Sequence, residues 1–120
     1  MATTAKRPAP RPPKLFEDLA RRHPEVFNAL DSLGLALRAS GPLDPKTCQL
    51  IQLAAAAAAR SEGAVHSHTR RALAAGATPQ EVEHTLMLLI STIGTPQVVA
   101  ALSWARDVSK KGRSRTRHHG

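Results

Sequence analysis

The sequence predicts an all-α protein. Two observations lead to that class: the composition, and the spacing of prolines and glycines along the chain. Only Phe16, Phe27 and Trp104 are aromatic and tyrosine is absent, so aliphatic side chains and alanines must fill the core. Apolar residues recur at three- and four-residue steps, and prolines and glycines divide them into stretches of helical length. The 120 residues are about the size of one domain, which predicts a single hydrophobic core.

The first two expected helices lie on either side of a proline. The stretch 15–23 forms a short helix that stops near His23, because the residue before Pro24 is pushed out of the α region. The second helix begins at Pro24 and continues to about Arg38. Its apolar residues follow the helical period: Val26, Phe27, Leu30, Leu33 and Leu37.

The third and fourth helices are expected to pack closely. The sequence "SGPLDP" supplies a glycine stop and then an Asp44–Pro45 helix start. The third helix is expected to continue to about Arg60 through six alanines, and such small side chains let a neighbouring backbone approach. We expect a break at Gly63 and then a fourth helix to about Ala75.

Two similar signals open the last two helices. They are Gly-Ala-Thr-Pro-Gln at 76–80 and Gly-Thr-Pro-Gln at 94–97. In each, glycine can end one helix, threonine can cap the next, and proline occupies a position where no donor is lost. The two helices are expected from Pro79 to about Ile93 and from Pro96 to about Val108. Short turns between them predict a compact bundle of antiparallel neighbours.

The lone cysteine and the many alanines bear on environment and assembly. Cys48 has no partner for an intrachain disulfide, which fits a reducing cytoplasm. No signal-like apolar run opens the sequence and no stretch of about 20 apolar residues occurs, so we expect a soluble, cytoplasmic protein without membrane contact. Few bulky side chains bury little apolar area per residue, so contacts between copies of the chain are expected to complete the core.

The net charge of +8 is concentrated at the two ends. Of the 17 lysines and arginines, four lie in residues 6–14 and five in residues 110–117, whereas residues 15–109 hold 8 basic and 9 acidic groups, 8 − 9 = −1. The sequence predicts disordered basic tails at 1–13 and 110–120 around a helical domain at 14–109. We expect the tails to promote solubility, and any contact they make with anionic polymers to be weak, non-specific and salt-dependent.

The stretch "HTRRALAAGATPQEVEHTLMLLISTIGTPQVVAAL", residues 68–102, resembles the carboxymuconolactone decarboxylase family, which includes the AhpD-like alkylhydroperoxidases. The resemblance lies in the order of a histidine, a helix ending in Ala-Leu-x-x-Gly-Ala-Thr, an acidic amphipathic helix, and Gly-x-Pro opening an alanine-rich helix. "LDPKTCQLIQLAAAAAAR" resembles the preceding helix of the family, so the resemblance covers roughly residues 43–108. It implies an AhpD-like bundle of about five to six helices that assembles as a trimer or hexamer.

The peroxidase branch of this family carries Cys-x-x-Cys-x-x-x-His with a glutamate upstream. Counted back from His68, the two cysteine positions hold Ser61 and Ala64, and the glutamate position holds Gln49. Peroxide reduction needs one thiolate to attack oxygen and a second to resolve the sulfenic acid. Serine and alanine can do neither, so AhpD-type peroxidase activity is the least expected function.

The resemblance to the decarboxylase branch makes His68 the candidate catalytic residue. Decarboxylation needs positive charge near the substrate carboxylate and a group that manages a proton at the carbanion carbon. His68, with His66 or Arg70, could supply both, and Gln49 and Ser61 complete the set of candidate substrate-binding residues. The expected ligand is a small carboxylate.

Structural explanations compete with each of these roles. His66 and His68 are about 200° apart on a helix, so they are not expected to chelate one metal, and no cofactor is expected. His68 could equally be a core or interface histidine, and Cys48 is expected to be inert packing. Two functions therefore stay open: a non-redox decarboxylase-type enzyme acting on a small carboxylated or lactone substrate, and a catalytically silent member that serves as an oligomeric scaffold for a ligand or partner.

Overall fold

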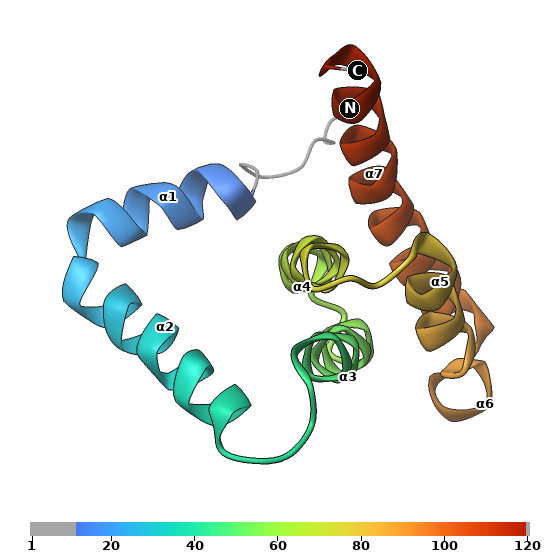
Figure 1. Cartoon of the computed structure of the whole chain (residues 1–120), viewed down its shortest axis with the longest axis horizontal. Coiled ribbons are helices and arrows are strands. Elements are labelled where there is room, and N and C mark those ends of the chain that lie inside the picture. The colour runs from blue at the N-terminus through green and yellow to red at the C-terminus, as the bar shows by residue number, and fades with distance from the viewer. Residues whose placement is uncertain (1–11, 120) are drawn as a thin grey trace, which may run out of the picture. The chain divides into compact units, whose positions relative to one another are not determined.

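The computed structural model describes the backbone of residues 12–119 and the side chains of residues 14–110. All the regular structure in this part of the chain is helical, which confirms the all-α prediction (Figure 1). In chain order, the helices are α1 (Pro12–Arg22), α2 (Pro24–Ala39), α3 (Pro45–Ala58), α4 (Glu62–Ala74), α5 (Pro79–Met87), α6 (Ile90–Ile93) and α7 (Thr95–His119).

The chain divides into two compact units, residues 1–42 and 43–120. The described part of the first unit contains α1 and α2, which are separated by the single non-helical residue His23. Phe16 on α1 packs edge to face against Phe27 on α2, with the ring centroids 5.2 Å apart. In this structure α2 contributes no buried side chain to any core.

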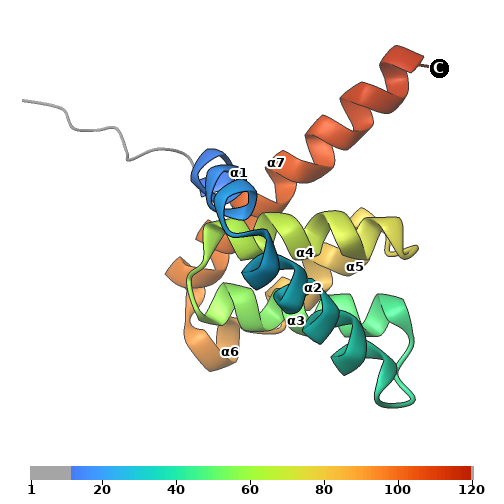
Figure 2. The same ribbon diagram turned by 90° about the vertical axis from the view of Figure 1, so that its left-hand side faces the viewer.

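The second unit is built on a hairpin of α3 and α4, joined by residues 59–61. α5 and α7 pack against this hairpin and against each other (Figures 1 and 2). Small and branched aliphatic side chains fill the core between these four helices, and small residues allow native packing density where backbones come close. The core residues include Leu53, Ala56, Ala57, Val65, Ala72, Val82, Leu86, Ala101 and Ala105.

The turn between α3 and α4 differs from the predicted one. α3 ends at Ala58, and Arg60 takes a positive φ of 58°, a conformation that usually favours glycine after a helix. The Ser61 hydroxyl then caps α4 by accepting a hydrogen bond from the Ala64 amide. Gly63 therefore lies in the first turn of α4 and not in a break, so the boundary predicted at Gly63 was wrong.

The helix predicted from Pro79 to Ile93 is interrupted. Its start is as expected, because Thr78 forms a reciprocal capping box with Glu81 and Gly76 has a φ of 105°. The Leu89 amide then bonds the Leu86 carbonyl, three residues back, so the helix tightens after Met87 and α6 follows as a separate short segment. The apolar period continues through this turn, which is why the sequence pattern did not reveal it.

The predicted tails lie at the limits of the described residues. The prediction of a disordered segment at 1–13 falls mainly on residues 1–11, which lie outside the described residues, and α1 already begins at Pro12. At the other end, the backbone of α7 continues as a helix to His119, through the segment 110–119 that the sequence assigned to a tail.

The end of α3 is held by a side chain from α7. The last carbonyls of a helix have no partner within the helix, and here the Gln97 Nε2 donates to the carbonyls of Ala57 at 3.0 Å and Ala58 at 2.9 Å.

We expect Gln97→Leu to lower the free energy of unfolding by about 1–2 kcal/mol, because it leaves these carbonyls without their donor. Urea denaturation measures the change. Gln80→Leu, at an exposed position of α5, is the control, and an equal effect of both variants would contradict the assignment.

The second unit should become less stable at acidic pH. A hydrogen bond from the Thr78 amide, and then the ion pair with Lys46, hold the pKa of Glu81 below its usual value, and bonds from Thr47 lower the pKa of Asp44. Because these pKa values are lower in the folded state than in the unfolded state, both carboxylates stabilise the fold at neutral pH. This contribution is lost as the pH falls through the folded-state values, below about pH 4.

Thermal unfolding between pH 7 and pH 3 tests this dependence. We expect the Tm to fall on acidification, and Glu81→Gln to lower the Tm at pH 7 while reducing its fall toward pH 3. A Glu81→Gln variant with the full pH dependence of the parent would show that this carboxylate is not one of the groups responsible.

Candidate active site

The structure brings Gln49 and His68 together across the α3–α4 hairpin. Gln49 lies on the buried face of α3 with only 6% of its surface exposed, and His68 lies on the adjacent, half-buried face of α4. The His68 Nδ1 and the Gln49 Oε1 are 2.9 Å apart, which is hydrogen-bond distance. A buried amide needs such a partner, because leaving it unsatisfied would cost about 1–3 kcal/mol.

This contact determines which ring nitrogen of His68 carries the hydrogen. An amide oxygen can only accept, so the His68 Nδ1 donates to the Gln49 Oε1 and carries a hydrogen. In the neutral ring, the Nε2 is then the basic nitrogen. Gln49 therefore fixes both the tautomer and the orientation of the ring, as a second group does for catalytic histidines in general.

Ser61 uses its hydroxyl in the helix cap described above, where the Oγ lies 3.2 Å from the Ala64 amide. It is seven positions before His68, so the two residues share a face of α4 about 10 Å apart along the axis. Ser61 therefore serves as the N-cap of α4, about two turns before His68.

His66 and Arg70 lie away from this pair. Each is two positions from His68, which turns it about 200° around the helix, and Arg70 is exposed. The His66 Nε2 lies 3.8 Å from the Glu62 Oε2, too far for a hydrogen bond, and this buried nitrogen has no hydrogen-bond partner in the structure. Of the five candidates, Gln49 and His68 are the pair that a hydrogen bond joins.

Cys48 is next to Gln49 in sequence and partly buried. Its Sγ lies 3.5 Å from the Leu43 carbonyl oxygen, at the start of α3. A thiol that bonds a backbone carbonyl in this way is typical of a packing cysteine, and the chain has no second cysteine to resolve an oxidised one.

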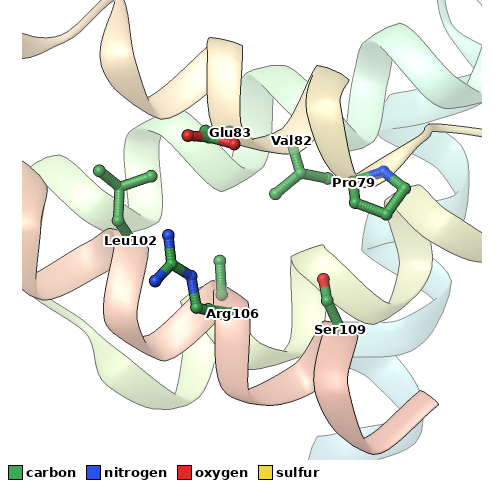
Figure 3. A pocket seen from close by; sticks show the side chains of 7 residues that line it. Pro79, Val82, Glu83, Leu102, Arg106 and Ser109 are labelled. Carbon is green, nitrogen blue, oxygen red and sulfur yellow. The ribbon is translucent and has the colours of Figure 1, made fainter. Parts of the chain in front are cut away.

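A small hollow that the sequence did not predict lies between α5 and α7. Its volume is about 100 Å³, and Glu83 and Arg106 extend into it from opposite sides (Figure 3). This is space for only a few water molecules, well below the roughly 300 Å³ of a small-molecule pocket. In the sequence, both charges look like ordinary solvent-exposed residues, so no pattern could have indicated their proximity. The full lining is Pro79, Val82, Glu83, Leu102, Ala105, Arg106 and Ser109.

The described residues contain neither a cluster of metal-binding side chains nor a helix that could cross a membrane. They contain no group of three or more histidine, cysteine, aspartate or glutamate side chains arranged to hold a metal ion. No helix within them combines the length and the apolar composition needed to cross a membrane.

The family of the chain follows from its sequence. The profile of the carboxymuconolactone decarboxylase family matches residues 24–107, and the chain belongs to this family. The match begins at α2, further toward the N-terminus than the resemblance read from the sequence.

Two relatives are similar to the chain, and both are uncharacterized. A protein of Haemophilus influenzae is 36% identical over 59 residues, which is 49% of this chain and 52% of that protein, so the chain covers about half of its length. The protein MJ1511 of Methanocaldococcus jannaschii is 26% identical over 98 residues, 82% of this chain and 92% of that protein. No solved structure gives a significant match to the chain.

We expect no thiol-dependent peroxidase activity from this protein. Ser61 and Ala64 occupy the two positions where the resemblance places thiols, and a single cysteine cannot complete a dithiol cycle. Peroxide consumption in the presence of a dithiol reductant should stay at the background rate, and Cys48→Ser should not change it. Turnover that is lost in Cys48→Ser would overturn this expectation.

Proposed function

We propose that the protein is a non-redox enzyme of the decarboxylase type, in which His68 transfers a proton to a small carboxylated or lactone substrate. The observation that supports this proposal is the 2.9 Å contact between the His68 Nδ1 and the Gln49 Oε1. Membership of the carboxymuconolactone decarboxylase family is consistent with such chemistry.

The proposed reaction needs one proton and no redox partner. Loss of the carboxylate as carbon dioxide breaks a carbon–carbon bond and leaves its electron pair on the substrate, where a conjugated carbonyl group accepts the charge. The His68 Nε2, protonated from solvent, then delivers a proton to the carbanion carbon. Gln49 keeps the ring in position through the Nδ1. Arg71, three positions after His68 and exposed, is close enough in helical register to attract the substrate carboxylate.

A specific observation also favours the second candidate, a catalytically silent scaffold that binds a ligand or partner. The hydroxyl of Ser61 is used in a helix cap, and His66 and Arg70 face away from His68. A single bond between the buried Gln49 and the half-buried His68 also satisfies both polar groups, which is a structural role in itself.

Release of carbon dioxide from carboxymuconolactone distinguishes the two candidates. If the chain is a decarboxylase, His68→Ala should lower kcat by about 10²–10⁴-fold, the usual contribution of a general acid, because the variant removes the proposed proton donor. Gln49→Ala should reduce kcat less, because the imidazole remains but loses its orientation. His84→Ala, an exposed histidine on α5, is the matched control and should behave as the parent.

Thermal stability provides the second measurement. His68→Ala that abolishes turnover with an unchanged Tm supports the enzyme. No carbon dioxide release by the parent, together with a lower Tm for both His68→Ala and Gln49→Ala, contradicts the decarboxylase proposal and supports the scaffold.

A further inference from the structure

The hollow between α5 and α7 contains two opposite charges that their own helices do not neutralise. Glu83 on α5 and Arg106 on α7 extend into it from opposite sides (Figure 3). Opposite charges three or four positions apart pair on a helix. The positions at these distances from Glu83 carry no basic residue, and those around Arg106 carry no acidic residue. Neither charge therefore has a partner on its own helix.

Glu83 and Arg106 do not neutralise each other either. The ion pairs formed among the described residues include neither of them. A carboxylate and a guanidinium group therefore face the same small space, and each is available to a bound group of the opposite charge.

Apolar side chains and one buried hydroxyl form most of the remaining wall. Val82 and Ala105 are buried, and Leu102 is half-buried. Ser109 is only 9% exposed, and its hydroxyl points into the hollow (Figure 3). A serine hydroxyl both donates and accepts hydrogen bonds, so the hollow offers a third polar group beside the two charges.

This combination of groups selects against simple ions. Arg106 repels a cation and Glu83 repels an anion, whereas a zwitterion places its carboxylate toward Arg106 and its ammonium group toward Glu83. Arginine binds a carboxylate through two parallel hydrogen bonds. Ser109, three positions after Arg106 on α7, supplies a further donor on the same face of the helix.

The volume of the hollow, about 100 Å³, limits the size of the ligand. It holds a few water molecules, on the order of five heavy atoms, which is about the size of glycine or alanine. The apolar wall accommodates a hydrogen or a methyl group as the side chain of such a ligand. A long or branched side chain exceeds the space, as does the substrate proposed for His68.

We propose that the α5–α7 hollow binds a short zwitterionic amino acid, of the size of glycine or alanine, between Glu83 and Arg106. All the lining residues belong to the second unit, so residues 1–42 do not form any part of the hollow. None of them lies on α3 or α4, so the proposal does not depend on whether the protein is a decarboxylase. A bound ligand connects α5 to α7 and stabilises the folded state.

An NMR titration of the full chain with glycine tests the site. We expect saturable shifts of the backbone amide signals of residues 79–83 and 102–109. The Kd should be on the order of millimolar, because ion pairs at exposed positions contribute little. Glu83→Gln and Arg106→Gln should each raise the Kd about tenfold or more, because each removes a charged hydrogen-bond partner. Asp107→Asn is the matched control: this carboxylate is exposed and adjacent to Arg106 but does not line the hollow, so the Kd should be unchanged.

Three further ligands test the charge and the size separately. Acetate and methylammonium each carry one of the two charges, and each should bind about tenfold more weakly than glycine, because it leaves one partner unpaired. Leucine carries both charges but exceeds the volume, so it should also bind about tenfold more weakly or not at all. Because Glu83 and Arg106 are exposed, their variants should keep the fold of the parent, which the same spectra verify.

Four results would contradict the proposal. The absence of saturable shifts in α5 and α7 would show that the hollow holds solvent only. Acetate that binds as tightly as glycine would indicate a simple anion site. Leucine that binds as tightly as glycine would show that the ligand is not confined to the hollow. An unchanged Kd in Arg106→Gln would place the bound glycine elsewhere.

Discussion

The second unit depends on the close approach of α3 and α4, and that approach depends on residues with very small side chains. Ala56 and Ala57 on α3, and Ala72 on α4, are buried where larger side chains would hold the two backbones apart. Alanine itself buries little apolar surface, so the stability of this hairpin comes from shape and from the few larger residues beside it, such as Leu53 and Val65. The short distance between the helices is also what lets an amide on one reach an imidazole on the other.

Polar contacts at the ends of helices complete this packing. Gln97 bonds the last carbonyls of α3, Ser61 caps α4, and Thr78 with Glu81 caps α5. Each contact satisfies a backbone group that a helix end would otherwise leave without a partner. Ser61 stands at the position where the resemblance to the peroxidases places the first cysteine. In this structure its hydroxyl instead caps the start of α4.

The two units differ in what they bury. Residues 43–110 form a core with Leu53, Val65 and Leu86 fully enclosed, whereas α2 keeps its apolar side chains exposed even though it belongs to the family domain. The Phe16–Phe27 contact joins α1 to α2 but does not cover the apolar residues that follow along α2.

The sequence by itself determined the helical class and most helix starts, because proline, glycine and capping residues act on neighbouring positions. Pro24, Pro45 and the Thr78–Pro79 pair begin helices where the pattern placed them. Gly63 was misread because Arg60 adopts the left-handed conformation in its place, and the turn after Met87 was missed because the apolar period continues through it.

The candidate site was predicted only in part, and tertiary structure decided the rest. The spacing that links Gln49 to His68 is a property of the sequence, but their contact depends on the distance and rotation between two packed helices, which local patterns do not specify. The separation of His66 and Arg70 from His68, by contrast, follows from the helical period alone, because two positions turn a residue about 200° around α4. The hollow with Glu83 and Arg106 exists only because α5 and α7 pack side by side, so no pattern along the chain could have indicated it.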